Sequence, residues 1–254
     1  MKIVKGTESM ESEDLLSRIS EVHPNQVWLD KEKVEKRYIY LFFKRMIDIV
    51  GSIIGLILAS PLMSYVAYRI RKEEPGSPIF FSHTRVGKNG KTFKMHKFRS
   101  MCLDAEEKLE ELLDQNEIEG AMFKMKEDPR VTQIGKIIRA KSIDELPQLW
   151  NVLKGDMSLI GPRPPLEREV AEYTRYDLQR LYVKPGCSGL WQVSGRNDVS
   201  FHEMVDLDLE YITNQSLLND FKLIIKTIWV VIKPNGHISK GKKSWKKQRL
   251  NMYI

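Results

Sequence analysis

A run of 20 residues without a charged side chain, from Ile49 to Tyr68, constrains the fold of this chain more than any other feature. An apolar helix of about 20 residues is long enough to cross the hydrocarbon core of a bilayer. Ser60 and Pro61 lie near the middle of the run, where proline removes a backbone donor and favours a kink. The sequence therefore predicts a membrane helix that is kinked at Ser60-Pro61.

The residues on either side of this run bear on its topology. Lys44 and Arg45 precede it, and Arg69, Arg71 and Lys72 follow it. Flanks that are both basic give no positive-inside asymmetry that would orient a crossing. We therefore expect a re-entrant helix that returns to the same, cytoplasmic side, and keep a straight spanning helix and a buried core hairpin as alternatives. Residues 1–40 are polar and lack the pattern of a cleavable secretory signal.

The excess positive charge is confined to the C-terminal segment. The formal net charge of the chain is +7, yet residues 1–220 contain 32 basic and 34 acidic groups, and nine basic residues but no acidic one follow Asp220. A basic tail with Trp245 suits an anionic membrane surface or RNA, and a merely solubilising tail is the simpler alternative.

Composition excludes several classes of protein. With 254 residues, 42% of them hydrophobic, the chain can form a substantial core and is neither disordered throughout nor collagen-like. Cys102 and Cys187 are too few for a disulfide framework, and neither lies in a C-x-x-C or Cys/His cluster that would indicate zinc. A reducing, cytoplasm-facing environment is the simpler interpretation.

The soluble part shows strand signals first and helical periodicity afterwards. Short strands are expected at 79–81, 84–86 and 92–95, with Asn89-Gly90 as a hairpin turn between the last two. Helices are expected at about 104–117, 131–139, 143–153, 166–182, 201–213 and 217–232, and Ser200 with Glu203 forms a capping box. The helix at 217–232 is too short and too charged to span a membrane, so it packs on the core or lies in the interface.

These elements predict an α+β fold. It combines the kinked re-entrant membrane helix and interfacial amphipathic helices with a small globular part that holds a short β-hairpin or sheet. The expected divisions are a polar extension (1–40), the re-entrant helix (41–75), a globular domain (76–235) and the basic tail (236–254).

Two adjacent acids carry the most chemical information. Ser142 and Glu145 match an S-x-x-E capping box, which would place Asp144 and Glu145 in the first turn of a helix, where anions are favoured. Capping alone would explain such acids, but Arg139, Lys141 and Arg163 lie near the same helix start. A carboxylate with several cations there could hold a diphosphate and its metal.

The spacing of the two acids limits the type of reaction that they can catalyse. Neighbouring side chains on a helix diverge by roughly 100°, so Asp144 and Glu145 cannot flank a glycosidic bond as the paired acids of a soluble glycosidase do. One acid is better suited as a nucleophile and the other as a metal ligand or helper.

Several motifs in one order make the chain resemble a known family. They are Lys44-Arg45-x-x-Asp48, the apolar run with Ser60-Pro61, Lys97-Phe98-Arg99-Ser100-Met101, Asp128-Pro129-Arg130-Val131-Thr132, Asp144-Glu145-Leu146-Pro147-Gln148, Gly155-Asp156-Met157-Ser158, Gly161-Pro162-Arg163-Pro164 and Lys184-Pro185-Gly186. Over residues 41–233 the chain is similar to the bacterial sugar transferases, the monotopic polyprenyl-phosphate phosphoglycosyl transferases. The tract from Gly189 to Asp198 looks like the hexose-1-phosphate branch, which initiates capsule, O-antigen or exopolysaccharide synthesis.

The resemblance implies a reaction and its participants. A sugar-1-phosphate would pass from a UDP-sugar to undecaprenyl phosphate, with release of UMP, on the cytoplasmic face of the inner membrane. The family's Asp-Glu dyad works with Mg²⁺ through a covalent phosphosugar, which makes Asp144 the expected nucleophile, Glu145 its partner, and both of them the metal ligands.

The resemblance also implies a set of substrate-binding residues. It includes Arg139, Lys141 and Arg163, the prolines Pro162 and Pro164 that fix the backbone of Arg163, and Lys97 and Arg99 for the donor or lipid phosphate. The identity of the UDP-sugar and any homo-oligomer stay open. The alternative function is a basic membrane-associated adaptor or nucleic-acid-binding module that uses the tail, whereas the transferase needs no nucleic acid.

Overall fold

The structure is a computed structural model that describes residues 27–105, 107–112, 125, 128–194 and 200–232. The predictions for the basic tail, for most of the N-terminal extension, for residues 195–198 and for the helix beyond residue 112 lie outside these ranges.

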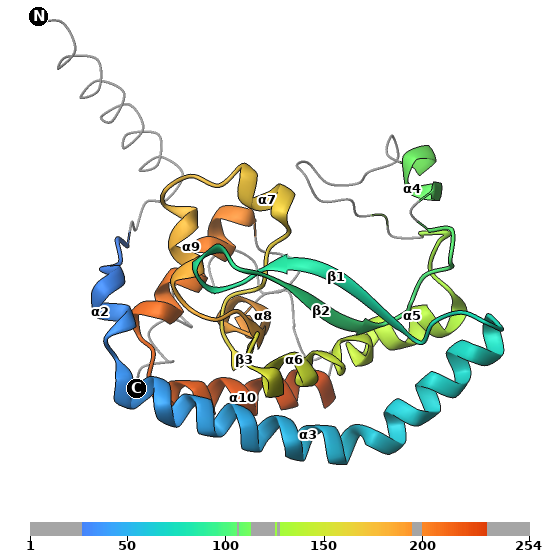
Figure 1. The fold of residues 1–254 in the computed structure, drawn as a ribbon, viewed down its shortest axis with the longest axis horizontal. Coiled ribbons are helices and arrows are strands. Elements are labelled where there is room, and N and C mark those ends of the chain that lie inside the picture. The colour runs from blue at the N-terminus through green and yellow to red at the C-terminus, as the bar shows by residue number, and fades with distance from the viewer. Residues whose placement is uncertain (1–26, 106, 113–124, 126–127, 195–199, 233–254) are drawn as a thin grey trace, which may run out of the picture.

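The described elements combine helices of 5 to 36 residues with two small sheets (Figure 1). The α-helices are α2 (Lys31–Glu35), α3 (Tyr38–Glu73), α4 (Glu107–Leu112), α5 (Gln133–Ala140), α6 (Gln148–Lys154), α7 (Glu167–Ala171), α8 (Leu190–Ser194), α9 (Phe201–Thr213) and α10 (Leu217–Ile232). The strands are β1 (Phe80–Val86), β2 (Thr92–Phe98), β3 (Ser158–Ile160) and β4 (Gly186–Ser188), and the 3₁₀ turns are η1 (Lys88–Gly90), η3 (Ile143–Glu145) and η4 (Asp177–Tyr182). This mixture of helices and small sheets confirms the α+β class.

Helix α3 contains the whole uncharged run. It is one helix of 36 residues with Pro61 inside it, and Figure 1 shows it following the lower edge of the molecule before turning upward in its second half. By length and composition it could cross a membrane, and only 11% of its most apolar stretch is buried. The predicted long apolar helix is confirmed, whereas its return to the same membrane face stays a prediction.

Three charged side chains attach the first half of α3 to the globular part. Lys44 Nζ lies 2.9 Å from Asp220 of α10. Arg45 donates to two backbone carbonyls in the last turn of α6, at 2.6 and 2.7 Å. Asp48 is buried and accepts from Ser158 Oγ and from the next backbone N–H of β3, both at 2.9 Å. One face of an otherwise apolar helix is thus fixed to three separate elements.

The hairpin β1–β2 confirms the predicted Asn-Gly turn. Asn89 has φ 56° and Gly90 has φ 78°, the left-handed conformation that such a turn requires. Pairing is continuous from Phe80 opposite Phe98 to Val86 opposite Thr92. The separate strands predicted at 79–81 and 84–86 are therefore wrong, because both belong to one strand.

Two predicted helices are divided in the structure. The helix expected at 143–153 is a 3₁₀ turn followed by α6, with Pro147 between them. The helix expected at 166–182 is α7 followed by η4, because Asp177 accepts hydrogen bonds from the backbone N–H and hydroxyl of Thr174 and so competes with helical pairing. The helices expected at 131–139, 201–213 and 217–232 are confirmed, as is the capping box of Ser200 with Glu203.

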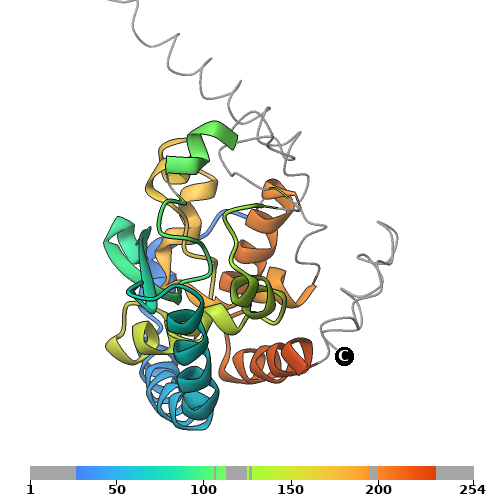
Figure 2. The ribbon, with the colours of Figure 1, turned by 90° about the vertical axis from the view of Figure 1, so that its right-hand side faces the viewer.

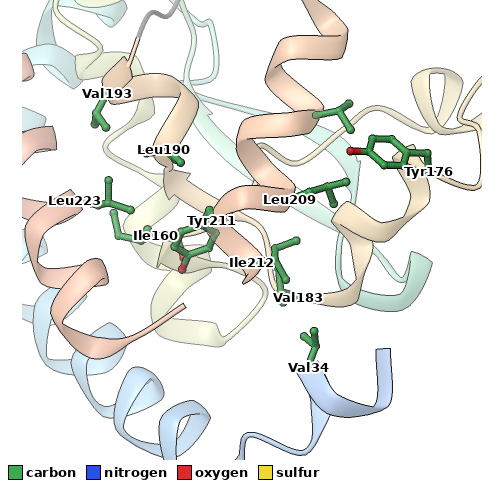
Figure 3. Packing of buried hydrophobic residues seen from close by; sticks show 11 residues of the cluster. Val34, Ile160, Tyr176, Val183, Leu190, Val193, Leu209, Tyr211, Ile212 and Leu223 are labelled. Carbon is green, nitrogen blue, oxygen red and sulfur yellow. The ribbon is translucent and has the colours of Figure 1, made fainter. Parts of the chain in front are cut away.

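The main core joins β3, β4 and the C-terminal helices. Ile160, Leu209, Tyr211 and Leu223 are buried together, as Figure 3 shows. Helix α10 packs Leu223 into this core but leaves a second apolar face exposed, formed by Leu218, Phe221, Ile225, Ile228 and Trp229. Figures 1 and 2 show α3 and α10 along the same lower side of the molecule, and both helices have exposed apolar side chains.

Glycines bring the backbone of β4 against the segment that follows β3. A Cβ on Gly186 would lie 2.1 Å from the backbone nitrogen of Gly161, and one on Gly161 would lie 2.6 Å from the Lys184 carbonyl. The Gly186 N–H donates to the Pro162 carbonyl at 2.8 Å. This close approach fixes the path of the chain just before Arg163.

Candidate active site

One face of the hairpin forms a wall of the candidate site. Cross-strand partners share a face, so Phe81 opposite Lys97 and His83 opposite Met95 lie on the same side as Arg85. All five of these side chains line a cavity. The alternation of the strands therefore places two cations, Arg85 and Lys97, on one surface.

The two acids enter this surface from η3. Asn151 of α6 is buried and ties that helix to β2, since its amide nitrogen donates to the Lys94 carbonyl at 2.7 Å and its oxygen accepts from the His96 N–H at 3.0 Å. The turn before α6 therefore lies against the hairpin. Glu145 Oε1 lies 2.6 Å from Lys97 Nζ in a half-exposed ion pair.

The predicted capping box at Ser142 is wrong. Ser142 has φ 55° and ψ 23°, a left-handed conformation, and its side chain makes no capping hydrogen bond. An N-cap residue normally has extended backbone angles, which Ser142 lacks. Left-handed serine is uncommon and costs backbone energy, which proteins tolerate mainly where a site demands it. Here it turns the chain between α5 and η3, so that Asp144 and Glu145 project from a 3₁₀ turn.

Two neighbouring cavities share Asp144. The smaller measures about 270 Å³, and its lining includes both acids, Gln148 of α6 and Trp191 of α8. The larger measures about 680 Å³ and extends past Phe98 and Arg99 toward the start of α7. Both cavities are also lined by Arg85, Met95, Lys97, Arg139 and Arg163. A buried carboxylate thus lies where two compartments meet, with four cationic side chains around it.

The electrostatics of Asp144 follow from this position. Burial raises the pKa of its carboxyl, Lys97 and Arg139 lower it, and Glu145 raises it further. A carboxylate that burial destabilises is a more reactive nucleophile if nearby cations keep it ionised at neutral pH.

Arg163 is held by the protein on both sides. Its Nη1 lies 3.8 Å from Glu169 Oε1. Its carbonyl accepts from Nη2 of Arg180 at 3.4 Å, and Arg180 is itself buried against Asp208. Arg139 is held by a hydrogen bond from its Nε to Ser100 Oγ at 2.9 Å.

The other predicted site residues differ in position. Pro164 lines the smaller cavity, and Arg99 lines the larger one while donating from Nε to the Pro78 carbonyl at 3.0 Å. Pro162 lines neither cavity and accepts a backbone hydrogen bond instead. Lys141 is exposed and also lines neither.

The donor set suits a hard divalent cation that is bound together with substrate. Among the described residues there is no cluster of three or more His, Cys, Asp or Glu side chains that could hold a metal. Mg²⁺ commonly binds through one or two carboxylates plus substrate phosphates and water. Asp144 and Glu145, both lining the smaller cavity, fit that arrangement.

Residues beyond the predicted set complete the site. The smaller cavity is also lined by Arg85, Gln148, Cys187, Trp191 and Gln192. The period of the hairpin could have indicated Arg85, because registering the two strands about Asn89-Gly90 places it on the face of Lys97. No local sequence signal indicates Cys187 or Gln192, which reach the site only through the β3–β4 pairing and α8.

The site has more cations than carboxylates, which suits anionic ligands. Helix α3 is long, apolar and mostly uncovered. Together these features indicate the class of membrane-associated proteins that bind anionic ligands. Comparison with known proteins agrees with this class. The family model for bacterial sugar transferases matches residues 39–234. The chain belongs to the bacterial sugar transferase family.

Named relatives come from several bacteria. The galactosyl transferase CpsE of Streptococcus agalactiae is 49% identical over 201 residues, which cover 79% of this chain and 44% of that protein. The undecaprenyl-phosphate galactose phosphotransferase of Salmonella typhimurium is 49% identical over 199 residues, covering 77% and 41%. The exopolysaccharide production protein ExoY of Rhizobium meliloti is 41% identical over 197 residues, covering 76% and 87%. The chain thus spans less than half the length of the first two relatives.

Proposed function

We propose that this chain transfers a sugar-1-phosphate from a UDP-sugar to undecaprenyl phosphate and releases UMP, as the initiating membrane step of exopolysaccharide, capsule or O-antigen synthesis. The observation that carries the proposal is the buried Asp144 beside Glu145 in a cavity whose lining also holds Lys97, Arg139 and Arg163. The names of related proteins, such as undecaprenyl-phosphate galactose phosphotransferase and UDP-N-acetylgalactosamine-undecaprenyl-phosphate N-acetylgalactosaminephosphotransferase, support the two substrate classes.

In the first step an Asp144 carboxylate oxygen attacks the phosphorus that bears the sugar. An oxygen–phosphorus bond forms to Asp144, the bond to the bridging oxygen breaks, and UMP leaves with that oxygen. In the second step a phosphate oxygen of undecaprenyl phosphate attacks the same phosphorus. The bond to Asp144 then breaks, which restores the carboxylate and gives the lipid-linked diphosphate sugar.

The surrounding side chains have separate roles in this scheme. Lys97 and Arg139 keep Asp144 ionised, and Arg163 offsets charge on the phosphates. Glu145, paired with Lys97, orients that cation. Mg²⁺ held by Asp144 and Glu145 with the substrate phosphates would supply further charge stabilisation.

We further propose a monotopic arrangement in which α3 bends near Pro61 and re-enters the same leaflet of the inner membrane, with α10 in the interface. The exposed apolar faces of both helices on one side of the molecule support it. The site then opens to the cytoplasm, where UDP-sugars are available, while the acceptor phosphate stays at the membrane surface.

The test is a turnover and trapping assay on the full chain in detergent. Protein is mixed with undecaprenyl phosphate and a panel of UDP-sugars, and UMP release is measured. With labelled UDP-sugar and no acceptor, the wild type should retain sugar-phosphate label, whereas Asp144→Asn should lose both label and turnover. Asp30→Asn is the matched control, because asparagine still caps α2 and residue 30 lines neither cavity. Equal labelling of wild type and Asp144→Asn would exclude the covalent mechanism.

A further inference from the structure

Arg85 occupies the candidate site without a carboxylate partner. Among the described residues, no ion pair includes it. Its Nη1 donates to the Pro164 carbonyl at 3.2 Å, a neutral acceptor, and its Nε is buried without a hydrogen-bond partner. A desolvated guanidinium costs free energy unless an anion or several acceptors compensate for the lost water.

The position of Arg85 is nonetheless fixed. Its strand neighbour Val86 donates a backbone hydrogen bond to the Pro165 carbonyl at 2.9 Å, and the strand pairs Arg85 with Phe93. The side chain therefore reaches the segment that carries Arg163 from the opposite wall, and it lines both cavities. Burial and the nearby charge of Arg163 lower the pKa of Arg85 to about 10, although the charges of Glu169 and Glu145 raise it.

The charges of the side chains that line the smaller cavity indicate an anionic ligand. The smaller cavity is lined by four cations, Arg85, Lys97, Arg139 and Arg163, against the carboxylates of Asp144 and Glu145. One of the four, Arg163, lies 3.8 Å from Glu169, so one positive charge stays uncompensated in a partly buried volume, and an anionic diphosphate would offset it. Guanidinium is suited to such a ligand because it can donate two parallel hydrogen bonds to phosphate oxygens.

We propose that Arg85 is a phosphate-binding residue of this site and holds the diphosphate of the nucleotide sugar from the hairpin side. This assignment rests on the proposed function, because it takes the diphosphate of the donor as the ligand. It adds to the site a cation that no sequence motif indicated, and it gives the β1–β2 hairpin a direct role in donor binding.

The experiment measures UDP binding by calorimetry with the full chain in detergent. Arg85→Gln should weaken UDP binding by at least tenfold, since a charge-assisted hydrogen bond is lost. Arg85→Lys should bind with intermediate affinity, and the control Arg175→Gln, at an exposed position outside both cavities, should match the wild type. Wild-type affinity in Arg85→Gln or in Arg85→Lys would overturn the proposal.

Thermal unfolding without ligand distinguishes a role of Arg85 in binding from a role in the stability of the fold. Because Arg85 is desolvated and unpaired, Arg85→Gln should melt at the wild-type temperature or above it. A clear fall in Tm would assign Arg85 a structural role and overturn the proposal. If Arg85→Gln cannot be purified, Arg85→Lys keeps the charge and carries the same binding test.

The two proposals fail in different ways. If wild type and variants differ in UDP binding as expected but no UDP-sugar yields UMP with undecaprenyl phosphate, the transfer reaction is wrong and the role of Arg85 in phosphate binding stands. If the wild type turns over and Arg85→Gln binds UDP equally well, only the assignment of Arg85 is wrong.

Discussion

The buried ion pair behind Arg163 allows a quantitative test of how the site is held. Arg180 and Asp208 each have only 1% of their side-chain surface exposed, and Arg180 Nη2 lies 2.7 Å from Asp208 Oδ2. Arg180 also donates to the Tyr173 hydroxyl at 2.7 Å and to the Arg163 carbonyl at 3.4 Å. Removal of the carboxylate would leave a buried guanidinium whose remaining acceptors are neutral.

The expected size of the effect follows from this burial. Deletion of one partner of a buried pair costs about 3–5 kcal/mol, so Asp208→Ala should lower the free energy of unfolding by about that amount. In a chain of this size each kcal/mol lowers Tm by about 2–4 °C, which gives a fall of about 6–20 °C. Asp208→Asn keeps the shape and one acceptor, so it should lie at the lower end of this range.

The control is an exposed pair in the same chain. Glu32 and Lys36 pair on the surface of α2 with 73% and 61% of their side chains exposed, so Glu32→Gln should shift Tm by no more than about 2 °C. Thermal unfolding in detergent, followed by intrinsic fluorescence, measures both variants. An Asp208→Ala shift as small as that of the control would refute the reasoning. A large shift with unchanged UDP affinity would show that the pair does not position Arg163.

Three further outcomes test the proposed chemistry and topology. Burial raises the pKa of Asp144 above its ordinary value, so kcat/KM for the donor should fall as the pH drops through that raised pKa. Lys97→Gln should shift this acidic side of the pH profile to higher pH, and an unchanged profile would contradict the role of Asp144 as nucleophile. EDTA should stop turnover and Mg²⁺ should restore it, whereas full activity in EDTA would leave charge stabilisation to the arginines. In a variant without Cys102 and Cys187, Ser9→Cys should not react with a membrane-impermeant thiol reagent on intact cells. Adding Pro61→Leu should straighten α3 and expose position 9 to the reagent. Labelling of position 9 with Pro61 retained would refute the re-entrant helix.

Features set by local rules were predictable from the sequence. Asn89-Gly90 specifies its turn through backbone angles alone, and Ser200 with Glu203 caps α9 through adjacent residues. The uncharged run gave helix α3 because its length and composition admit few other structures. Each of these depends on residues close together in the chain.

Features set by distant contacts were not predictable in this way. Ser142 was expected to cap a helix, but the packing of α6 on β2 through Asn151 requires a turn there, and the serine takes left-handed angles instead. Thr174 and Asp177 end a helix that periodicity alone would continue. The motif indicated Asp144 as the nucleophile, and its side chain lines both cavities, whereas Arg85 needed the hairpin register to bring it near Lys97.

The attachment of α3 also has a consequence for biosynthesis. Lys44, Arg45 and Asp48 find their partners 107 to 176 residues later in the chain. The helix leaves the ribosome long before those partners exist, so its three charged side chains are at first unsatisfied. The contacts that fix α3 to the globular part are complete only after α10 has been made, which makes the placement of this helix a late step in folding.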